Sequence, residues 1–180
     1  MAKTPTVAGL RALWATPEGK GIAAGMGSGA VLAAALFSQH VGGLAPCALC
    51  ILQRWPHALA LLAAAALWKA RGTHWARPLL LLGTVAAALA VATAFFHVGV
   101  ESRFWGSPFG CGLPDWSDPN LATTLATTTP ADCATPAWTF LGHSLAAWNM
   151  LLSSVLVGLW AGAWVKTGRD GLDGADSANP

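Results

Sequence analysis

The chain is organised around residues 46–54, which read PCALCILQR. In helical geometry Cys47 and Cys50 are neighbours at i,i+3, and Cys50 and Arg54 are neighbours at i,i+4. Pro46 has no N–H and fits at or just before the first helical turn. Both thiols therefore lie near a helix N-terminus, where unpaired N–H groups favour the thiolate, and the charge of Arg54 favours it as well. The stretch indicates a dithiol suited to thiol–disulfide exchange.

Other interpretations of this stretch stay open. A C-x-x-C pair can be half of a zinc site or a structural disulfide. A four-cysteine zinc site usually uses two close pairs, whereas the remaining cysteines, Cys111 and Cys133, are far apart in the sequence. Arg54 taken alone could be a side chain that snorkels to a membrane surface, but its place beside Cys50 on one helical face weakens that interpretation.

The composition is that of a membrane protein. Of the 180 residues, 54% are apolar and 10% are charged, against about 25% charged in a typical soluble domain. The chain has ten tryptophans and no tyrosine. The net charge of +2 is too small to indicate nucleic-acid binding, and we find no glycine-rich phosphate loop and no paired catalytic carboxylates.

Four apolar segments are long enough to cross a hydrocarbon core of about 30 Å as helices. They cover residues of about 21–41, 47–68, 78–98 and 143–165. The first could be a signal peptide, but its apolar run exceeds the about 7–15 residues of a signal sequence. Gly25, Gly27 and Gly29 within it could permit close helix packing, and Pro56 could kink the second segment. We therefore predict an all-α, four-transmembrane-helix bundle, a single membrane domain over residues 1–180, with a long loop at 99–140 between helices 3 and 4.

The placement of positive charge predicts the orientation. Lys and Arg concentrate on the side of the two termini and the middle loop, at Lys3, Arg11, Lys20, Lys69, Arg71, Arg77, Lys166 and Arg169. The opposite side has Arg103 and, close to the interface, Arg54. Because positive residues favour the cytoplasmic side, both tails, 1–20 and 166–180, are expected in the cytoplasm, the second of them disordered. Both cysteine-bearing regions then face outward, which in a bacterium is the oxidising periplasm, where cysteines are expected to pair.

The distal cysteines, Cys111 and Cys133, lie in the long outward loop and enclose about twenty residues. A disulfide that closes such a loop would restrain it by about 3 kcal/mol in the chain-entropy model. A purely stabilising bridge is therefore one interpretation of this pair.

With its elements in this order, the sequence resembles the DsbB family of inner-membrane, quinone-linked thiol oxidases. The resemblance covers residues of about 21–165 and rests on PCALCILQR at 46–54, His97 at the end of the third span, SPF at 107–109 before Cys111, WTFLG at 138–142 after Cys133, and Trp148-Asn149. One departure is Ala146-Ala147, where a proline is expected in the family.

The resemblance implies an electron relay. Electrons would arrive from a periplasmic thioredoxin-fold oxidase (DsbA-like), enter at the distal pair, pass to the C-x-x-C pair and leave to a membrane quinone, ubiquinone or menaquinone. In the family the positions of Arg54 and His97 are associated with the quinone. Arg54 would stabilise the Cys50 thiolate and the charge that develops on the quinone oxygen. His97 could donate a hydrogen bond to the other carbonyl, or be an interfacial histidine. Gln53 and His57 are weaker candidates, and we interpret His57 as a helix-face histidine.

The spacing and shared outward side of the cysteines predict Cys47–Cys50 and Cys111–Cys133 as the resting pairs. In the relay order that the family implies, the partner's thiolate attacks Cys111 and releases Cys133, which attacks Cys47 and frees Cys50. Asp132 should raise the pKa of Cys133, which makes it a slower leaving group but a stronger nucleophile once freed. Gly110 and Gly112 leave the sulfur of Cys111 little shielded, which favours attack there. The sequence therefore argues both ways on the first step and favours the second.

Three competing functions remain at this point. A paralogue that serves one dedicated substrate oxidase would use the same residues. A non-enzymatic membrane protein would hold two structural disulfides or a bound metal. An enzyme of the vitamin-K-epoxide-reductase type also joins a C-x-x-C to a quinone in a four-helix bundle, but there the active pair is expected near the last span, whereas here it opens the second.

Overall fold

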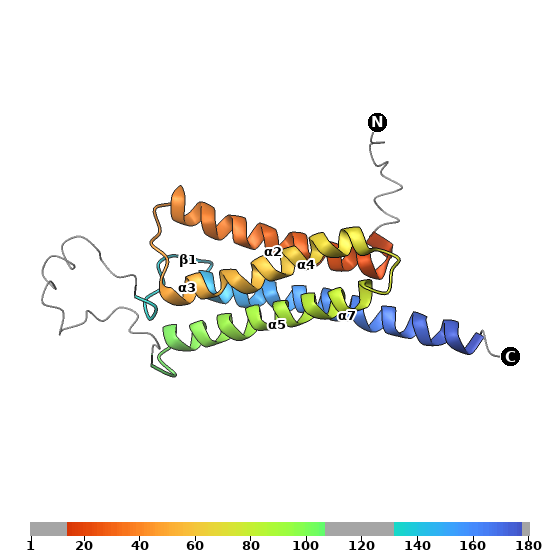
Figure 1. The fold of residues 1–180 in the computed structure, drawn as a ribbon. Coiled ribbons are helices and arrows are strands. Elements are labelled where there is room, and N and C mark those ends of the chain that lie inside the picture. The colour runs from red at the N-terminus through yellow and green to blue at the C-terminus, as the bar shows by residue number, and fades with distance from the viewer. Residues whose placement is uncertain (1–13, 107–131, 178–180) are drawn as a thin grey trace, which may run out of the picture.

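In the computed structural model, residues 14–106 and 132–177 are described, with side chains up to residue 170. Four long helical segments run side by side along the molecule (Figure 1). They are α2 (Pro17–His40), α3 with α4 (Ala48–Leu52 and Arg54–Ala70), α5 (Ala76–Glu101) and α7 (Leu145–Ser177). Each is long and apolar enough to cross a membrane, so the expected four-helix membrane bundle is confirmed. An unexpected two-residue antiparallel ladder, β1 (Thr139–Phe140) with β2 (His143–Ser144), precedes α7.

Small residues let the helices approach closely in the core. A Cβ on Gly25 of α2 would lie 2.1 Å from the Cβ of Ala64 on α4, which confirms the close packing expected there. A Cβ on Gly83 of α5 would lie 2.4 Å from the ring of Trp160, which is fully buried on α7. Membrane helices pack in this way because lipid gives no hydrophobic force between them, so contact area must come from close approach.

The outer surface of the bundle is apolar. Leu62, Leu89 and Val155 have exposed fractions of 67%, 49% and 63%. A large exposed apolar surface would be a liability in water, whereas on a helix that crosses a bilayer it is the surface that contacts lipid. The fold and the composition therefore agree on a multi-pass membrane protein.

The second span is interrupted at one residue, Gln53, whose backbone keeps helical angles (φ −64°, ψ −19°). Its two helices are separated at Gln53, and Pro56 is the third residue of α4. The first N–H groups of a helix have no partner within it, so a proline is tolerated there. Pro56 therefore interrupts the hydrogen-bond ladder of the span near Gln53, and the expected kink stays a prediction.

The prediction of a disordered C-terminal tail is wrong for residues 166–177. Helix α7 continues without a break to Ser177. Extending an existing helix adds one hydrogen bond for each residue fixed, without a new nucleation cost, and the first proline after α7 begins is Pro180.

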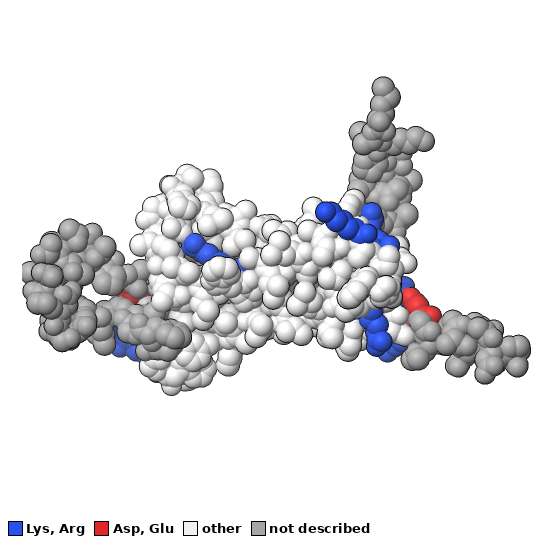
Figure 2. All heavy atoms as spheres, in the orientation of Figure 1, with Lys and Arg blue, Asp and Glu red and all other residues white. Residues whose placement is uncertain are grey.

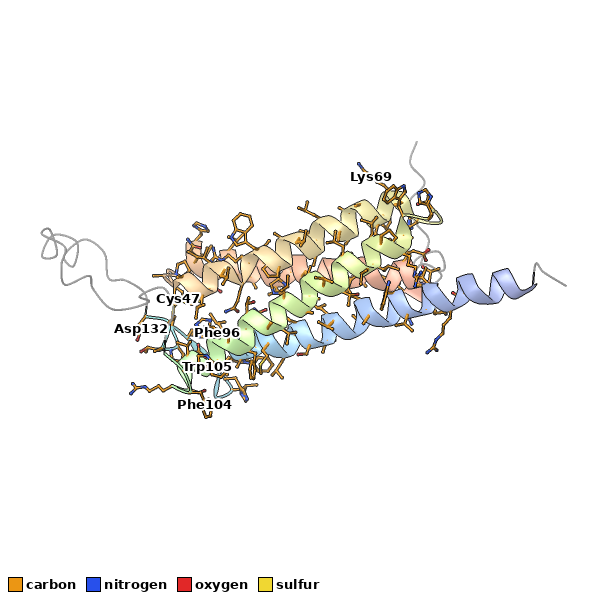
Figure 3. All side chains as sticks on the ribbon, turned by 60° about the horizontal axis from the view of Figure 1, so that its bottom comes forward. Cys47, Lys69, Phe96, Phe104, Trp105 and Asp132 are labelled. Carbon is orange, nitrogen blue, oxygen red and sulfur yellow. The ribbon has the colours of Figure 1, made fainter. Side chains whose placement is uncertain are left out.

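The two ends of the bundle differ in charge. Figure 2 shows Lys and Arg gathered mainly at the end where the described chain begins, where α4 turns into α5 and where α7 leaves the bundle, with fewer toward the opposite end. The described members of this group are Lys20, Lys69, Arg71, Arg77, Lys166 and Arg169. Figure 3 places Lys69 at this end and Cys47 and Asp132 at the opposite end.

Candidate active site

The two thiols of the C-x-x-C pair lie at a helix N-terminus, as expected. Cys47 is the N-cap of α3, and its Sγ accepts the Cys50 backbone N–H at 3.3 Å. The Cys47 thiol also donates to the Cys50 Sγ at 3.0 Å. This shared proton and burial together raise the pKa of Cys47. Cys47 is therefore the sulfur that keeps its proton, and Cys50 is the acceptor.

The pair is present as two thiols and not as the resting disulfide predicted from the sequence. A disulfide bond requires sulfur atoms about 2.05 Å apart, whereas these are 3.0 Å apart and share a hydrogen bond. The structure therefore corresponds to the reduced form of this pair, and the disulfide stays a prediction for the oxidised form.

The distal cysteine Cys133 packs directly against the dithiol. It is 1% exposed, is disulfide-bonded, and forms one buried cluster with Cys47, Leu49 and Val100. Its expected partner, Cys111, lies outside the described residues, so that pairing stays a prediction. The contact matters because exchange between the two pairs requires their sulfur atoms to meet.

Asp132 precedes this cysteine and is stabilised as a carboxylate. Its side chain accepts hydrogen bonds from the Ala134 backbone N–H at 2.9 Å and from the Thr135 hydroxyl at 2.8 Å. These two bonds lower the pKa of Asp132. A negative charge therefore adjoins Cys133, and its expected effect on the thiol pKa of Cys133 stays a prediction for the reduced form.

Arg54 is half-buried and tied to helix α2. Its Nη1 donates to Gln39 Oε1 at 2.7 Å. Its Nε is buried and has no hydrogen-bond partner among the described residues. An unpaired buried donor is costly, so this atom is suited to an oxygen atom of a ligand.

A chain of polar side chains crosses the bundle below the thiols. His57 Nε2 and Asn149 Oδ1 are 2.8 Å apart, Asn149 Nδ2 donates to Gln53 Oε1 at 2.6 Å, and Gln53 Nε2 lies 2.6 Å from His97 Nδ1. We call this set the amide–histidine chain. It joins α4, α7, the α3–α4 junction and α5. The interpretation of His57 as a helix-face histidine missed its partner, although polar residues inside membrane spans are costly and generally functional.

His97 faces the sulfur atoms. Its Nε2 is 3.7 Å from Cys47 Sγ and 3.9 Å from Glu101 Oε1, and its ring hydrogen-bonds with the backbone of Cys133. The hydroxyl of Ser144 donates to Glu101 Oε2 at 2.5 Å. A role of His97 as a donor to a quinone carbonyl or as an interfacial histidine stays a prediction. Its polar neighbours here are Gln53, Cys47, Glu101 and the backbone of Cys133, and it also lines the apolar cavity described next. Glu101 was missed because nothing in its local sequence links it to the cysteines.

The dithiol lies between two cavities of different character. An apolar cavity of about 200 Å³ lies between α2, α4 and α7. Its polar lining residues include Ser38, Gln39, Cys50, Gln53, Arg54, His57, His97 and Asn149. A second cavity of about 440 Å³ is lined by Cys47 and Cys50 together with His97, Glu101 and Asp132. The pair is therefore accessible to an apolar ligand on one side and adjoins polar groups and the disulfide-bonded Cys133 on the other.

The same groups could hold a metal ion. One ligand atom from each of Cys47, Cys50 and His97 lies within 4.8 Å of the others. Thiolate and imidazole are the ligands that Zn²⁺ takes. Cys133 does not join this set, because it is already in a disulfide.

Comparison with known proteins points to one family. The model of the family "Disulfide bond formation protein DsbB" matches residues 21–163. A disulfide bond formation protein B of Verminephrobacter eiseniae is 34% identical over 139 residues, which cover 71% of this chain and 74% of the relative. That of Methylococcus capsulatus is 34% identical over 142 residues, covering 68% and 78%. That of Xanthomonas campestris pv. campestris is 35% identical over 138 residues, covering 73% and 80%. No solved structure matches the chain significantly.

Proposed function

Since the chain belongs to the DsbB family of disulfide bond formation proteins, we propose that it is a membrane protein-thiol oxidase that reoxidises a periplasmic, DsbA-like thioredoxin-fold oxidase and passes the electrons to a membrane quinone. The family membership makes it a disulfide-forming oxidoreductase of the membrane. The quinone, the partner and the roles of single residues are the proposed part.

One observation carries the proposal: the dithiol lies between an apolar cavity and a disulfide-bonded cysteine. Cys50 lines the apolar cavity, and Cys47 packs against Cys133. A structural disulfide needs neither an adjacent cavity nor a second redox-active cysteine in contact with it. This arrangement supports a relay with an entry from the loop and an exit to a ligand in the bilayer.

On the partner side, the cysteines exchange disulfides in two steps. The partner's thiolate attacks Cys111, which forms a partner–Cys111 disulfide and releases the Cys133 thiolate. Cys133 then attacks the oxidised pair at Cys47, which frees the Cys50 thiolate. The packing of Cys133 against Cys47 supports this choice of sulfur.

On the lipid side, the polar groups of the cavity fit a quinone headgroup. Arg54 Nε and His57 Nδ1 are buried and unpartnered among the described residues, and both residues line the apolar cavity beside Cys50. A bound quinone would supply an acceptor for two electrons and two protons. Arg54 would stabilise negative charge on Cys50 and on the ligand oxygen, and His97, together with Glu101, would act at the Cys47 proton.

We further propose that the chain lies in a bacterial inner membrane with both termini in the cytoplasm. The clustering of Lys and Arg at one end of the bundle supports this orientation. The cysteines then face the periplasm, where disulfides form and persist.

The test is whether the purified full-length protein oxidises a reduced thioredoxin-fold oxidase only when a quinone is present. We expect turnover with a short-tailed ubiquinone or menaquinone, and loss of turnover in Cys50→Ser. Metal content without quinone, and no turnover with either quinone, would instead support a metal site built from Cys47, Cys50 and His97.

A further inference from the structure

The amide–histidine chain has one direction along its whole length. His57 Nε2 donates to Asn149, Asn149 donates to Gln53, and Gln53 donates to His97 Nδ1. A neutral imidazole carries its proton on one nitrogen only. The direction of the chain therefore leaves His57 Nδ1 without a proton and puts the proton of His97 on Nε2.

The two ends of this amide–histidine chain lie at the two places where the reaction would occur, and at the His97 end the ring also hydrogen-bonds with the backbone of Cys133. His57 is 3% exposed, lines the apolar cavity, and its Nδ1 has no partner among the described residues. His97 Nε2 is 3.7 Å from Cys47 Sγ. A group in the cavity and the thiol of Cys47 are thus joined through four side chains that hydrogen-bond in series.

Both internal links are primary amides, so the chain can be reversed without moving a helix. Turning the amides of Gln53 and Asn149 by half a turn exchanges their donors and acceptors. Ser153 donates to Asn149 Oδ1 at 3.2 Å, and its hydroxyl can accept from the turned amide instead. In the reversed chain His57 carries its proton on Nδ1, and His97 presents a lone pair on Nε2.

We propose that the amide–histidine chain couples the ligand in the apolar cavity to the proton on Cys47. A ligand oxygen that can only accept, such as a quinone carbonyl, selects the direction with a proton on His57 Nδ1. His97 Nε2 then gives up the N–H that bonds to the backbone of Cys133 and presents a lone pair that can act as a base: the S–H bond of Cys47 breaks, an N–H bond forms at Nε2, and no electrons move in this step. Glu101 Oε1, 3.9 Å from Nε2, compensates the positive charge of the ring. A ligand hydroxyl, as in the reduced quinone, selects the opposite direction. The proposal rests on the proposed quinone oxidase function.

The direct test is ring-nitrogen NMR of the oxidised full-length protein in detergent, with ¹⁵N-labelled histidine and signals assigned from His57→Phe and His97→Phe. Adding a short-tailed ubiquinone should move the proton of His57 to Nδ1 and that of His97 to Nδ1, and the reduced quinone should reverse both. In Asn149→Leu only His57 should respond. If that variant does not fold, Asn149→Asp replaces it: a carboxylate cannot donate to Gln53, so His97 should not respond to the ligand. Unchanged tautomers in the parent chain, or a His97 response in these variants, would overturn the coupling.

A binding measurement separates this proposal from the function on which it rests. Quenching of tryptophan fluorescence by the short-tailed quinone should show affinity about tenfold lower in His57→Phe, the effect of one lost hydrogen bond. Ser154→Ala, which removes an exposed hydroxyl of α7 bonded to its own backbone, should bind like the parent chain. No saturable binding of ubiquinone or menaquinone by the parent chain would overturn both proposals, whereas binding without a change of tautomer would overturn only the coupling.

Discussion

Replacing Gly25 by alanine should force α2 away from α4 at their closest approach. The new Cβ would lie 2.1 Å from the Cβ of Ala64 and 3.2 Å from the carbonyl oxygen of Ala60. Carbon atoms in contact are about 3.5–4.0 Å apart, so the helices would have to separate by more than about 1 Å. Neither neighbour is a flexible side-chain end, so the strain cannot be relieved by a change of rotamer.

The expected loss of stability is a balance of two terms. Overpacking a well-packed core typically costs about 1–3 kcal/mol. Alanine in place of glycine inside a helix returns about 0.5–1 kcal/mol. We therefore expect Gly25→Ala to lower the free energy of unfolding by about 1–2 kcal/mol. Combining it with Ala64→Gly moves the methyl group to the other helix and should recover most of the overpacking term.

The assay is reversible unfolding of the full-length protein in mixed detergent micelles, followed by tryptophan fluorescence. The matched control is Gly158→Ala on α7, where a Cβ meets nothing within 4 Å, and this variant should be at least as stable as the parent. Because α2 also carries Gln39, the partner of Arg54, quinone affinity should fall together with stability. Two results would refute this account of the α2–α4 contact. One is equal stability of Gly25→Ala and Gly158→Ala, and the other is a double variant Gly25→Ala/Ala64→Gly that is no more stable than Gly25→Ala.

Three further predictions concern the cysteines and Arg54. Arg54→Ala should lower the apparent quinone affinity by about tenfold or more, the effect of losing a hydrogen bond to a charged group. Exchange between the cysteine pairs should persist, and the control Arg169→Ala should have no effect. Unchanged affinity in Arg54→Ala would mean that Arg54 only snorkels to the membrane surface. A DsbA-like partner without its resolving cysteine should be trapped as a mixed disulfide, and peptide mapping should place the link at Cys111; a link mainly at Cys47 or Cys50 would make the loop pair only a brace. Because the shared hydrogen bond and burial raise the pKa of Cys47 above its ordinary 9.0, its protonated form persists to higher pH. In a chain with Cys111 and Cys133 replaced by serine, thiolate absorbance should therefore show at most one thiolate for the reduced pair at pH 9, and two at that pH would contradict the assignment.

The sequence by itself was sufficient for the features that depend on local pattern. Long apolar segments determine the four spans because the bilayer excludes unpaired backbone groups. The C-x-x-C spacing and Pro46 place Cys47 at a helix N-terminus, and i,i+4 spacing brings Arg54 to the same cavity as Cys50. The tail was mispredicted because polar composition alone does not end a helix that has already formed.

Only the tertiary structure determined which side chains meet across the bundle. Asn149 lies 96 residues from Gln53 and 92 residues from His57 in the sequence, yet bonds to both, and His97 lies 50 residues from Cys47. Helical periodicity places a residue on a face, but the rotation and depth of each helix relative to its neighbours come from packing. Here close contacts such as Gly25 against Ala64 and Gly83 against Trp160 set that register. This register turns His57 inward to Asn149 and His97 toward the sulfur of Cys47. The buried polar groups can reach one another only because these close contacts hold the helices near together.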